Sequence, residues 1–210
     1  MVGQMNTGAR RSRSAPLIAA ALALFVIAGG ALWLAHGRAA PGAGPLAGSG
    51  IGGPFALVDQ DGRARTGRDF AGTYRLIYFG YTFCPDVCPT DLARNARALA
   101  ALGPDLAARV QPIFITIDPE RDTPAVLKAY VSNFPPRLIG LTGSPDAVRR
   151  AATAWKVYAV RRTEEAGAAG YLMDHTALTY LMGPDGAPIA FYTSDQSPAQ
   201  VATELTRYVR

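Results

Sequence analysis

The sequence predicts an α/β protein, with a central mixed sheet flanked by helices and preceded by an N-terminal transmembrane helix. Short apolar runs, which are typical of buried strands, alternate with segments that open on a hydroxyl residue followed by proline, which is typical of a helix start. Two further pairs of short runs enclose turn residues and indicate hairpins. An uncharged apolar stretch, 17–34, precedes all of these elements.

The apolar stretch 17–34 is long enough to cross a bilayer. As a helix rising ~1.5 Å per residue it reaches roughly 27 Å, close to the thickness of the hydrocarbon core. Arginines precede it and no acidic residue occurs before Asp59, so the N-terminus is expected in the cytoplasm. The sequence therefore predicts four regions, which are a cytoplasmic N-terminus (1–16), a transmembrane signal-anchor (17–35), a Gly/Pro/Ala-rich linker (36–52) and a soluble domain (53–210).

This orientation predicts a single-pass protein of a bacterial inner membrane, with its soluble domain in the periplasm. A signal peptide cleaved after Ala39 is the alternative, although the apolar run exceeds the ~7–15 residues usual in signal peptides. The formal charge of +5 belongs largely to the same part of the chain, because residues 1–40 contain four arginines and no acidic residue. The remaining 17 basic and 16 acidic residues nearly cancel, so nothing indicates a surface for nucleic acid.

Turn residues and apolar runs predict the strands of the domain. Residues 54–70 have the pattern of a short hairpin around Asp61-Gly62, and a second hairpin is expected across Pro184-Asp185-Gly186, between 177–182 and 188–192. Continuous apolar runs predict buried strands at 74–80, 110–117 and 138–141.

Helices are expected between these strands, and residues 161–170 are expected to form a polar, Gly-rich loop. The first helix runs from about 89 to 102, with Pro89 in its first turn, where a missing amide hydrogen has no cost. Three others begin with a hydroxyl cap and proline, at Thr123-Pro124 (to 133), Ser144-Pro145 (to 157) and Ser197-Pro198 (to the C-terminus). Helices that connect strands in this order require a largely parallel sheet covered on both faces. A thioredoxin-like fold answers this description.

Both cysteines of the chain lie in one heptapeptide, Phe83-Cys84-Pro85-Asp86-Val87-Cys88-Pro89. They follow a predicted buried strand and stand at a helix N-terminus, where partial positive charge and free amides favour thiolate over thiol. Thiolates attack disulfides and bind soft metals, so the pair is redox-active or part of a metal site. A structural disulfide is the alternative, but closing so short a loop removes little entropy from the unfolded chain.

The spacing of the cysteines distinguishes a redox-active pair from a metal site. Thioredoxin-type oxidoreductases have two residues between their cysteines, whereas this loop has three, which lets the sulfurs spread for joint coordination of one ion. Two sulfurs leave such a site incomplete, and His175, in a predicted loop before the late hairpin, is the domain's single histidine. Two thiolates and an imidazole suit copper, because thiolate selects Cu(I) and the added nitrogen tolerates Cu(II). Zinc in a structural site would require a fourth ligand.

Around these residues the chain resembles the Sco/SenC family of membrane-anchored, thioredoxin-like, copper-binding proteins. The resemblance extends from about Gly53 to the C-terminus and rests on the segments 78–89, 117–124, 140–143 and 174–176. It implies that Cys84, Cys88 and His175 are three copper ligands and that Cys84 and Cys88 form a redox-active disulfide. Asp86, Asp118 and Asp174 are candidates for groups that surround the ligands, although helix capping explains Asp86 equally well.

The resemblance implies a metallochaperone that helps to mature the binuclear copper centre of cytochrome c oxidase subunit II. Such a protein binds and transfers copper and is not an enzyme, and a copper donor and a thiol reductant are its expected further partners. The alternative is a thiol–disulfide reductase that acts on the oxidase copper-site cysteines, with one cysteine attacking and the other resolving. A peroxidase is a third option, because Thr82-Phe83-Cys84 resembles peroxiredoxin-like sites. It is weaker, because a paired Cys88 so close by and a matching His175 favour metal.

Overall fold

A computed structural model describes residues 44–163 and 170–210, which belong to one compact unit of the chain. The predicted cytoplasmic N-terminus and transmembrane helix, together with linker residues 36–43, lie outside the described residues. Within the described ranges, no helix has the length and apolar character needed to cross a membrane.

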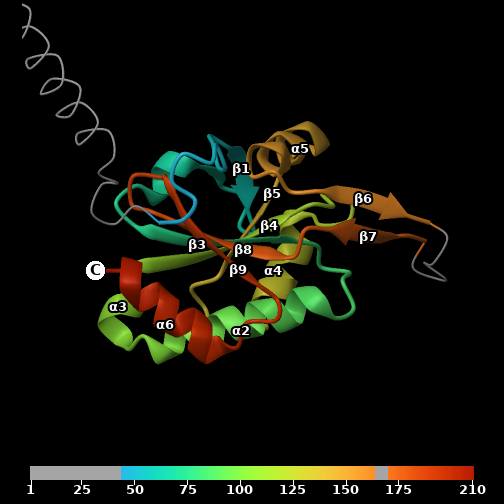
Figure 1. Cartoon of the computed structure of the whole chain (residues 1–210). Coiled ribbons are helices and arrows are strands. Elements are labelled where there is room, and N and C mark those ends of the chain that lie inside the picture. The colour runs from blue at the N-terminus through green and yellow to red at the C-terminus, as the bar shows by residue number, and fades with distance from the viewer. Residues whose placement is uncertain (1–43, 164–169) are drawn as a thin grey trace, which may run out of the picture. The chain divides into compact units, whose positions relative to one another are not determined.

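The main sheet has seven strands in the order β2-β1-β5-β4-β3-β8-β9 (Figure 1). Strand β4 pairs in parallel with β3 and β5, and the remaining neighbours are antiparallel, so the predicted mixed sheet is confirmed. The sheet is less parallel than expected, because the first hairpin supplies one edge and the late hairpin the other. The strands are β1 (Ala56–Asp59), β2 (Ala64–Thr66), β3 (Tyr74–Gly80), β4 (Val110–Thr116), β5 (Ile139–Thr142), β8 (Leu178–Met182) and β9 (Pro188–Thr193).

Helices cover both faces of this sheet. In Figure 1, α2, α4 and α6 lie below the sheet and α5 lies above it, as the crossover connections require. Three helices begin at the predicted hydroxyl caps, whose side chains accept a hydrogen bond from the backbone three residues later. The helices are η1 (Gly67–Phe70, a 3₁₀ turn), α2 (Val87–Ala101), α3 (Pro104–Ala108), α4 (Pro124–Val131), α5 (Pro145–Ala154) and α6 (Pro198–Tyr208).

The fold differs from the sequence prediction in three segments. Helix α2 begins two residues before Pro89, because proline is tolerated throughout the first turn. The short helix α3 was not expected. Part of the predicted loop 161–170 belongs instead to a two-stranded hairpin, which pairs β6 (Ala159–Arg162) with β7 (Leu172–His175) and projects beyond the main sheet (Figure 1).

Residues 44–52, which the sequence assigns to the linker, contact the domain. The Leu46 amide donates to the Ile189 carbonyl over 3.0 Å, and the Gly52 amide donates to the Ala154 carbonyl over 2.9 Å. Leu46 is buried in the core. The ordered unit therefore begins several residues before Gly53.

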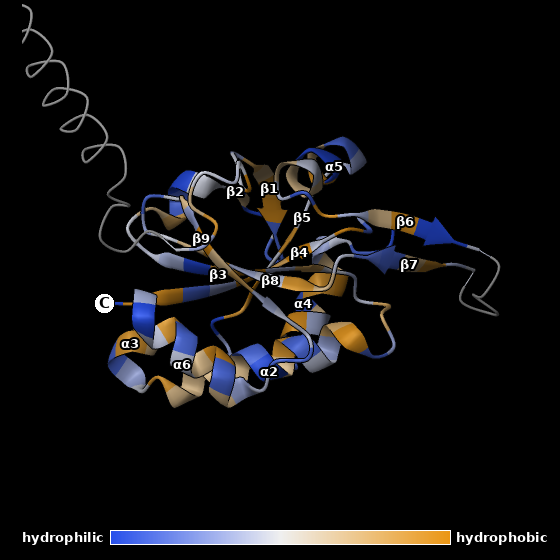
Figure 2. Ribbon diagram, viewed as in Figure 1, coloured by the Kyte–Doolittle hydropathy of each residue, from blue (hydrophilic) through white to orange (hydrophobic). Residues whose placement is uncertain are grey.

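The core lies between the sheet and the helices on each face. The central strands β3 and β4 are almost completely buried, and the helices turn their apolar stripes toward them while their outer faces are hydrophilic (Figure 2). Because β3 and β4 are parallel, their carboxyl ends meet at the same edge of the sheet. The segments that follow them, 81–86 and 117–123, therefore lie together, and the cysteines are on the first of these.

Candidate metal centre

The turn after β3 carries Cys84 to the N-terminus of α2, where Cys88 occupies the first turn. The Cys84 amide donates to the Tyr81 carbonyl over 3.3 Å, which closes the turn. The Cys88 amide in turn donates to Cys84 Sγ over 3.4 Å, so the helix N-terminus supports this sulfur directly. Cys84 is 9% exposed and Cys88 is fully buried. Cys84 is thus the less deeply buried of the two cysteines.

His175 completes a group of three donors. It is the last residue of β7, and Cys88 Sγ lies 3.4 Å from its Nε2 atom. The two sulfurs and one ring nitrogen all lie within 4.8 Å of one another. Thiolate and imidazole ligands sit roughly 2.0–2.3 Å from an ion such as zinc, so two donors of one soft ion are at most about 4.6 Å apart. Small side-chain movements would bring all three onto a single ion.

The hydrogen bond of the other ring nitrogen orients His175. Its Nδ1 lies 3.1 Å from the Thr176 carbonyl oxygen, which can only accept. Nδ1 therefore carries the hydrogen, and the lone pair of Nε2 faces the sulfurs. The rings of Tyr78 and Tyr81 meet the imidazole edge to face, with centroids 6.3 and 5.9 Å away. The site is thus lined by aromatic rings that limit contact with water.

The pKa values of the two thiols are shifted in opposite directions. A hydrogen bond from the Cys88 side chain is the main cause that lowers the pKa of Cys84; burial opposes this shift, and hydrogen bonds from the Asp86 and Cys88 amides add to it. The same bond, together with complete burial, raises the pKa of Cys88. The pair therefore holds one thiolate, on Cys84, and one thiol, on Cys88. A cation that binds both sulfurs must displace the Cys88 proton.

Gly80, the last residue of β3, makes room for the sulfur of Cys88. A Cβ atom at this position would lie 2.7 Å from Cys88 Sγ and 3.0 Å from the rings of Tyr78 and Phe114. All three neighbours are fully buried and cannot withdraw into solvent. A side chain here would push Cys88 away from the other two donors.

We expect Gly80→Ala to lower the free energy of unfolding by about 1–3 kcal/mol, because a well-packed core resists an added methyl group. Gly67→Ala is the matched control, since its Cβ would meet nothing nearer than 3.8 Å. Urea unfolding of the two variants, followed by circular dichroism, provides the comparison. Equal stability of the two variants would show that Cys88 is not confined by Gly80.

A buried aspartate fixes the cysteine turn from the neighbouring segment. Asp122 accepts hydrogen bonds from the Thr82 amide (3.0 Å), the Thr82 hydroxyl (2.6 Å) and the Thr116 hydroxyl (2.5 Å). Burial raises its pKa, and the hydrogen bonds from these two threonines oppose that shift. Asp122 therefore ties the residue two positions before Cys84 to the end of β4.

A second set of contacts holds the β6–β7 hairpin against the domain. Asp118 accepts a hydrogen bond from the Tyr171 hydroxyl (2.8 Å) and pairs with Arg121 (2.5 Å). The Arg121 guanidinium lies 3.6 Å from the centroid of the Tyr171 ring and donates to the Tyr171 carbonyl over 3.0 Å. Because Tyr171 directly precedes β7, this arrangement positions the strand that carries His175.

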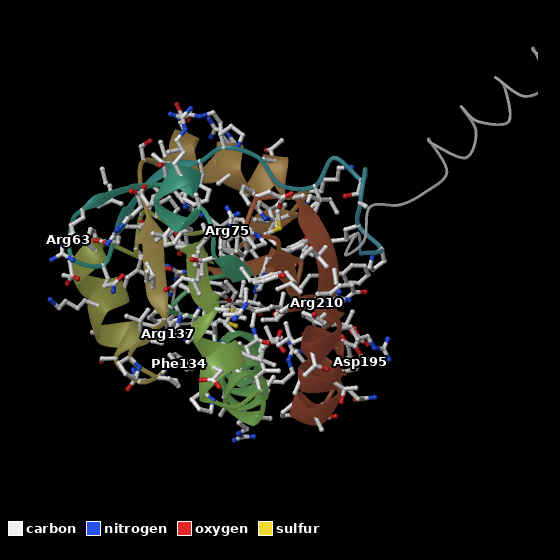
Figure 3. All side chains as sticks on the ribbon, turned by 90° about the vertical axis from the view of Figure 1, so that its left-hand side faces the viewer. Arg63, Arg75, Phe134, Arg137, Asp195 and Arg210 are labelled. Atoms are coloured by element: carbon white, nitrogen blue, oxygen red, sulfur yellow. The ribbon has the colours of Figure 1, made fainter. Side chains whose placement is uncertain are left out.

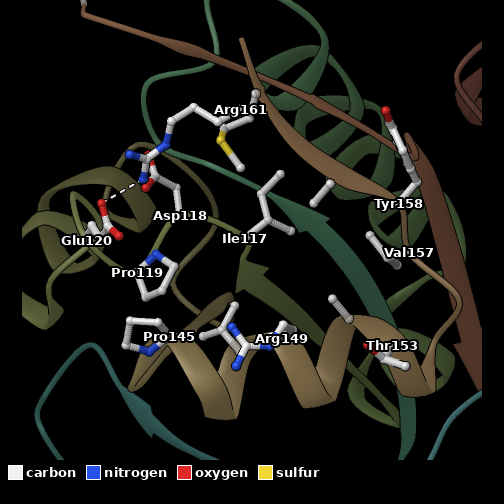
Figure 4. Close-up of a pocket in the computed structure, with 14 residues that line it drawn as sticks. Ile117, Asp118, Pro119, Glu120, Pro145, Arg149, Thr153, Val157, Tyr158 and Arg161 are labelled. Carbon is white, nitrogen blue, oxygen red and sulfur yellow. Dashed lines mark hydrogen bonds and ion pairs between the residues drawn. The ribbon is translucent and has the colours of Figure 1, made fainter. Parts of the chain in front are cut away.

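A cavity of 430 Å³ adjoins this anchorage, between α5, β6 and the segment after β4. Figure 4 shows Glu120 and Arg161 joined by an ion pair beside Asp118, with an N–O distance of 2.6 Å. On this side the hairpin thus contacts the domain through polar groups around an open cavity.

The three aspartates singled out from the sequence have different surroundings. Asp118 is buried beside Arg121, as described above. Asp86 is exposed, makes no capping hydrogen bond with its side chain, and accepts only a long one, 3.4 Å, from the Thr90 hydroxyl. The Asp174 carboxylate is exposed and pairs with Arg162 over 2.7 Å, along the hairpin.

Sequence reasoning overlooked Gly80, Arg121 and Asp122 as parts of the site. Each stands next to a motif that was recognised, since Gly80 ends the strand before the cysteines and the other two lie in the segment 117–124. Their position at the ends of two parallel strands was the available signal.

Comparison with known proteins gives a consistent result. Residues 44–210 match the model of the SCO1/SenC family. Protein SenC of Rhodobacter capsulatus is 41% identical over 155 residues, which cover 74% of this chain and 69% of that protein. Alignments with the mitochondrial SCO1 and SCO2 homologues of Arabidopsis thaliana, Danio rerio and Homo sapiens cover 50 to 57% of those longer proteins. The chain thus spans little more than half the length of these relatives.

Solved structures agree with the sequence relatives. The structure of Bradyrhizobium japonicum ScoI with copper bound is 47% identical and superimposes with a TM-score of 0.68, covering 75% of this chain and 99% of ScoI. BsSco, a member of the Sco family of cytochrome c oxidase assembly proteins in which a disulfide switch was identified, is 25% identical with a TM-score of 0.60, over 76% of this chain and 93% of BsSco. The thioredoxin-like α/β architecture is common to these proteins.

Proposed function

The chain belongs to the SCO1/SenC family, and we propose that it binds one copper ion through Cys84, Cys88 and His175. The observation that carries this proposal is the convergence of two sulfurs and one imidazole nitrogen within 4.8 Å. Thiolates favour Cu(I), and the neutral imidazole allows Cu(II) to be held as well. The chain would hold the copper as cargo for transfer.

The arrangement of the donors suits release as well as binding. Three donors leave a coordination position open, so an incoming ligand of a recipient protein has access to the ion. Cys84 is the more exposed of the sulfurs, whereas Cys88 is fully buried. The pKa of Cys88 is raised, so reprotonation of this buried sulfur would favour its release of the ion.

The recipient that we propose is subunit II of cytochrome c oxidase, in the maturation of its binuclear copper centre. The support is the family resemblance and the relation to BsSco, which belongs to a family of oxidase assembly proteins. A copper donor and a thiol reductant would act before this step. The predicted span 17–35 would anchor the chain in the bacterial inner membrane, with the domain in the periplasm beside the oxidase.

Replacing His175 tests the role of the imidazole. We expect His175→Ala to weaken Cu(II) binding by more than about 100-fold, since even the loss of a group that merely supports a metal ligand costs 10- to 100-fold. His36→Ala, at the other histidine of the sequence, is the control and should bind as the unchanged protein does. Titration of the full chain in neutral detergent, followed by absorption and electron paramagnetic resonance, measures both. Unchanged Cu(II) binding in His175→Ala would exclude this histidine as a ligand.

A thiol–disulfide reductase remains the second candidate, because the two sulfurs differ in the manner such an enzyme requires. The lowered pKa of Cys84, the less deeply buried of the two cysteines, suits an attacking thiolate, and fully buried Cys88 suits the resolving thiol. His175→Ala separates the two functions, since the variant should still exchange disulfides with a small disulfide substrate. If His175→Ala instead lost disulfide exchange but still bound Cu(II), the result would favour the reductase function.

A further inference from the structure

Arg75, at the start of β3, is a deeply buried arginine. It is 6% exposed, and among the described residues it forms no ion pair. Its Nη2 atom donates to the Gly183 carbonyl over 2.7 Å, while Nε is buried without a hydrogen bond to any described residue. An ionised group buried in this way is costly unless an opposite charge accompanies it.

In the other deeply buried arginine of the described residues, an ion pair and hydrogen bonds offset the cost of burying the charge. Arg94, 5% exposed, pairs with Asp91 over 2.9 Å and also donates to Thr179 over 3.0 Å and to Asn95 over 3.1 Å. Arg75 has a single carbonyl in place of this network. Burial lowers the pKa of Arg75, and the charge of Asp185 opposes that shift without forming an ion pair.

The Arg75 guanidinium lines a cavity of 590 Å³ at the end of the domain opposite the candidate metal centre. Gly186, with φ +89°, lies so close that a Cβ atom would be 3.2 Å from Nη2, and a Cβ at Gly67 would be 4.0 Å from Nη1. Two glycines thus lie near the guanidinium, and neither has a side chain that would fill the space. Figure 3 looks onto this end of the domain and labels Arg75.

The charges around the cavity leave an excess of one positive charge. Arg68 and Arg75 line it, and Asp185 is the one acidic residue among the described groups that line it. The Asp185 carboxylate accepts a hydrogen bond from the Ala187 amide over 2.9 Å, which keeps it within its own turn. An anion entering the cavity would meet two guanidinium groups, of which one is already desolvated.

We propose that this cavity binds a phosphate group, with Arg75 as the buried donor and Arg68 as the donor at the surface. Guanidinium groups bind phosphate with short, charge-assisted hydrogen bonds, and several phosphate oxygens allow two arginines to share one ligand. The cavity is larger than a free phosphate ion, so the group could belong to inorganic phosphate or to the headgroup of an anionic lipid. The site is independent of copper binding, because five strand residues (76–80) at ~3.3 Å each separate Arg75 from the cysteine turn.

Calorimetric titration of the full chain in neutral detergent with inorganic phosphate, at constant ionic strength, tests the proposal. We expect saturable binding by the unchanged protein, and about tenfold or greater weakening in Arg75→Gln and in Arg68→Gln, since each removes a charge-assisted bond. Arg63→Gln is the matched control, because Arg63 is an exposed arginine outside the cavity whose side chain is 68% accessible. Its phosphate affinity should not change.

Arg68→Gln keeps the test decisive if Arg75→Gln does not fold, because Arg68 is an exposed surface residue. Absence of saturable phosphate binding, or equal affinity in the unchanged protein and Arg68→Gln, would overturn the proposal. A parallel titration with short-chain phosphatidylglycerol identifies the source of the phosphate. Tighter binding of this lipid than of inorganic phosphate, lost in Arg68→Gln, assigns the site to a lipid headgroup, and weaker binding assigns it to free phosphate.

Discussion

Cys84→Ser and Cys88→Ser are each expected to abolish retention of Cu(I). One thiolate and one imidazole hold a soft monovalent ion poorly, and the hydroxyl of serine does not replace a thiolate. Both cysteines pack in the apolar core, but the fold should persist because serine nearly matches cysteine in shape. Copper content after gel filtration of the Cu(I)-loaded full chain, together with circular dichroism, measures both effects.

Met182→Leu is the matched control for the loss of a sulfur. Met182 is almost completely buried in β8, and leucine is close to it in volume. This variant should retain one equivalent of copper. A full equivalent of tightly held copper in either serine variant would place the site elsewhere in the chain.

Oxidation of the cysteine pair is expected to prevent copper binding. Both cysteines are free in the structure, and their sulfurs lie within 4.8 Å of each other. A disulfide would draw them to about 2.05 Å and consume both thiolates, leaving His175 alone. Titration of the oxidised full chain with Cu(I) and Cu(II) should therefore show no binding at this site, and reduction should restore it.

The reciprocal effect gives an internal control, because bound copper should protect the pair from thiol reagents. Alkylation of Cys84 by iodoacetamide is expected to stop when one equivalent of copper is present. If the oxidised chain binds copper with the same affinity and spectrum as the reduced chain, the cysteines act only as redox groups. The reductase function would then replace copper transfer as the proposal.

Helices and strands could be predicted from the sequence wherever a local signal existed. Three hydroxyl–proline pairs start α4, α5 and α6 at the expected residues, because such caps act within one turn of the chain. The buried strands β3 and β4 were equally clear, since both faces of a central strand are covered and leave a continuous apolar run. The hairpin β6–β7 was missed, because its strands are only four residues long, mix apolar with charged residues, and pair across the intervening segment 163–171.

The sequence by itself determined which residue types were available for the candidate centre, namely two cysteines in one loop and one histidine in the domain. It also determined the position of the loop after a buried strand, because that run and the following helix are local features. Only the tertiary structure decided that His175 meets the cysteines, since 87 residues separate it from Cys88 and a hairpin held by Asp118, Arg121 and Tyr171 brings it there. Only the tertiary structure, likewise, left Arg75 buried without an ion pair to any described residue, because burial and pairing depend on residues far apart in the chain.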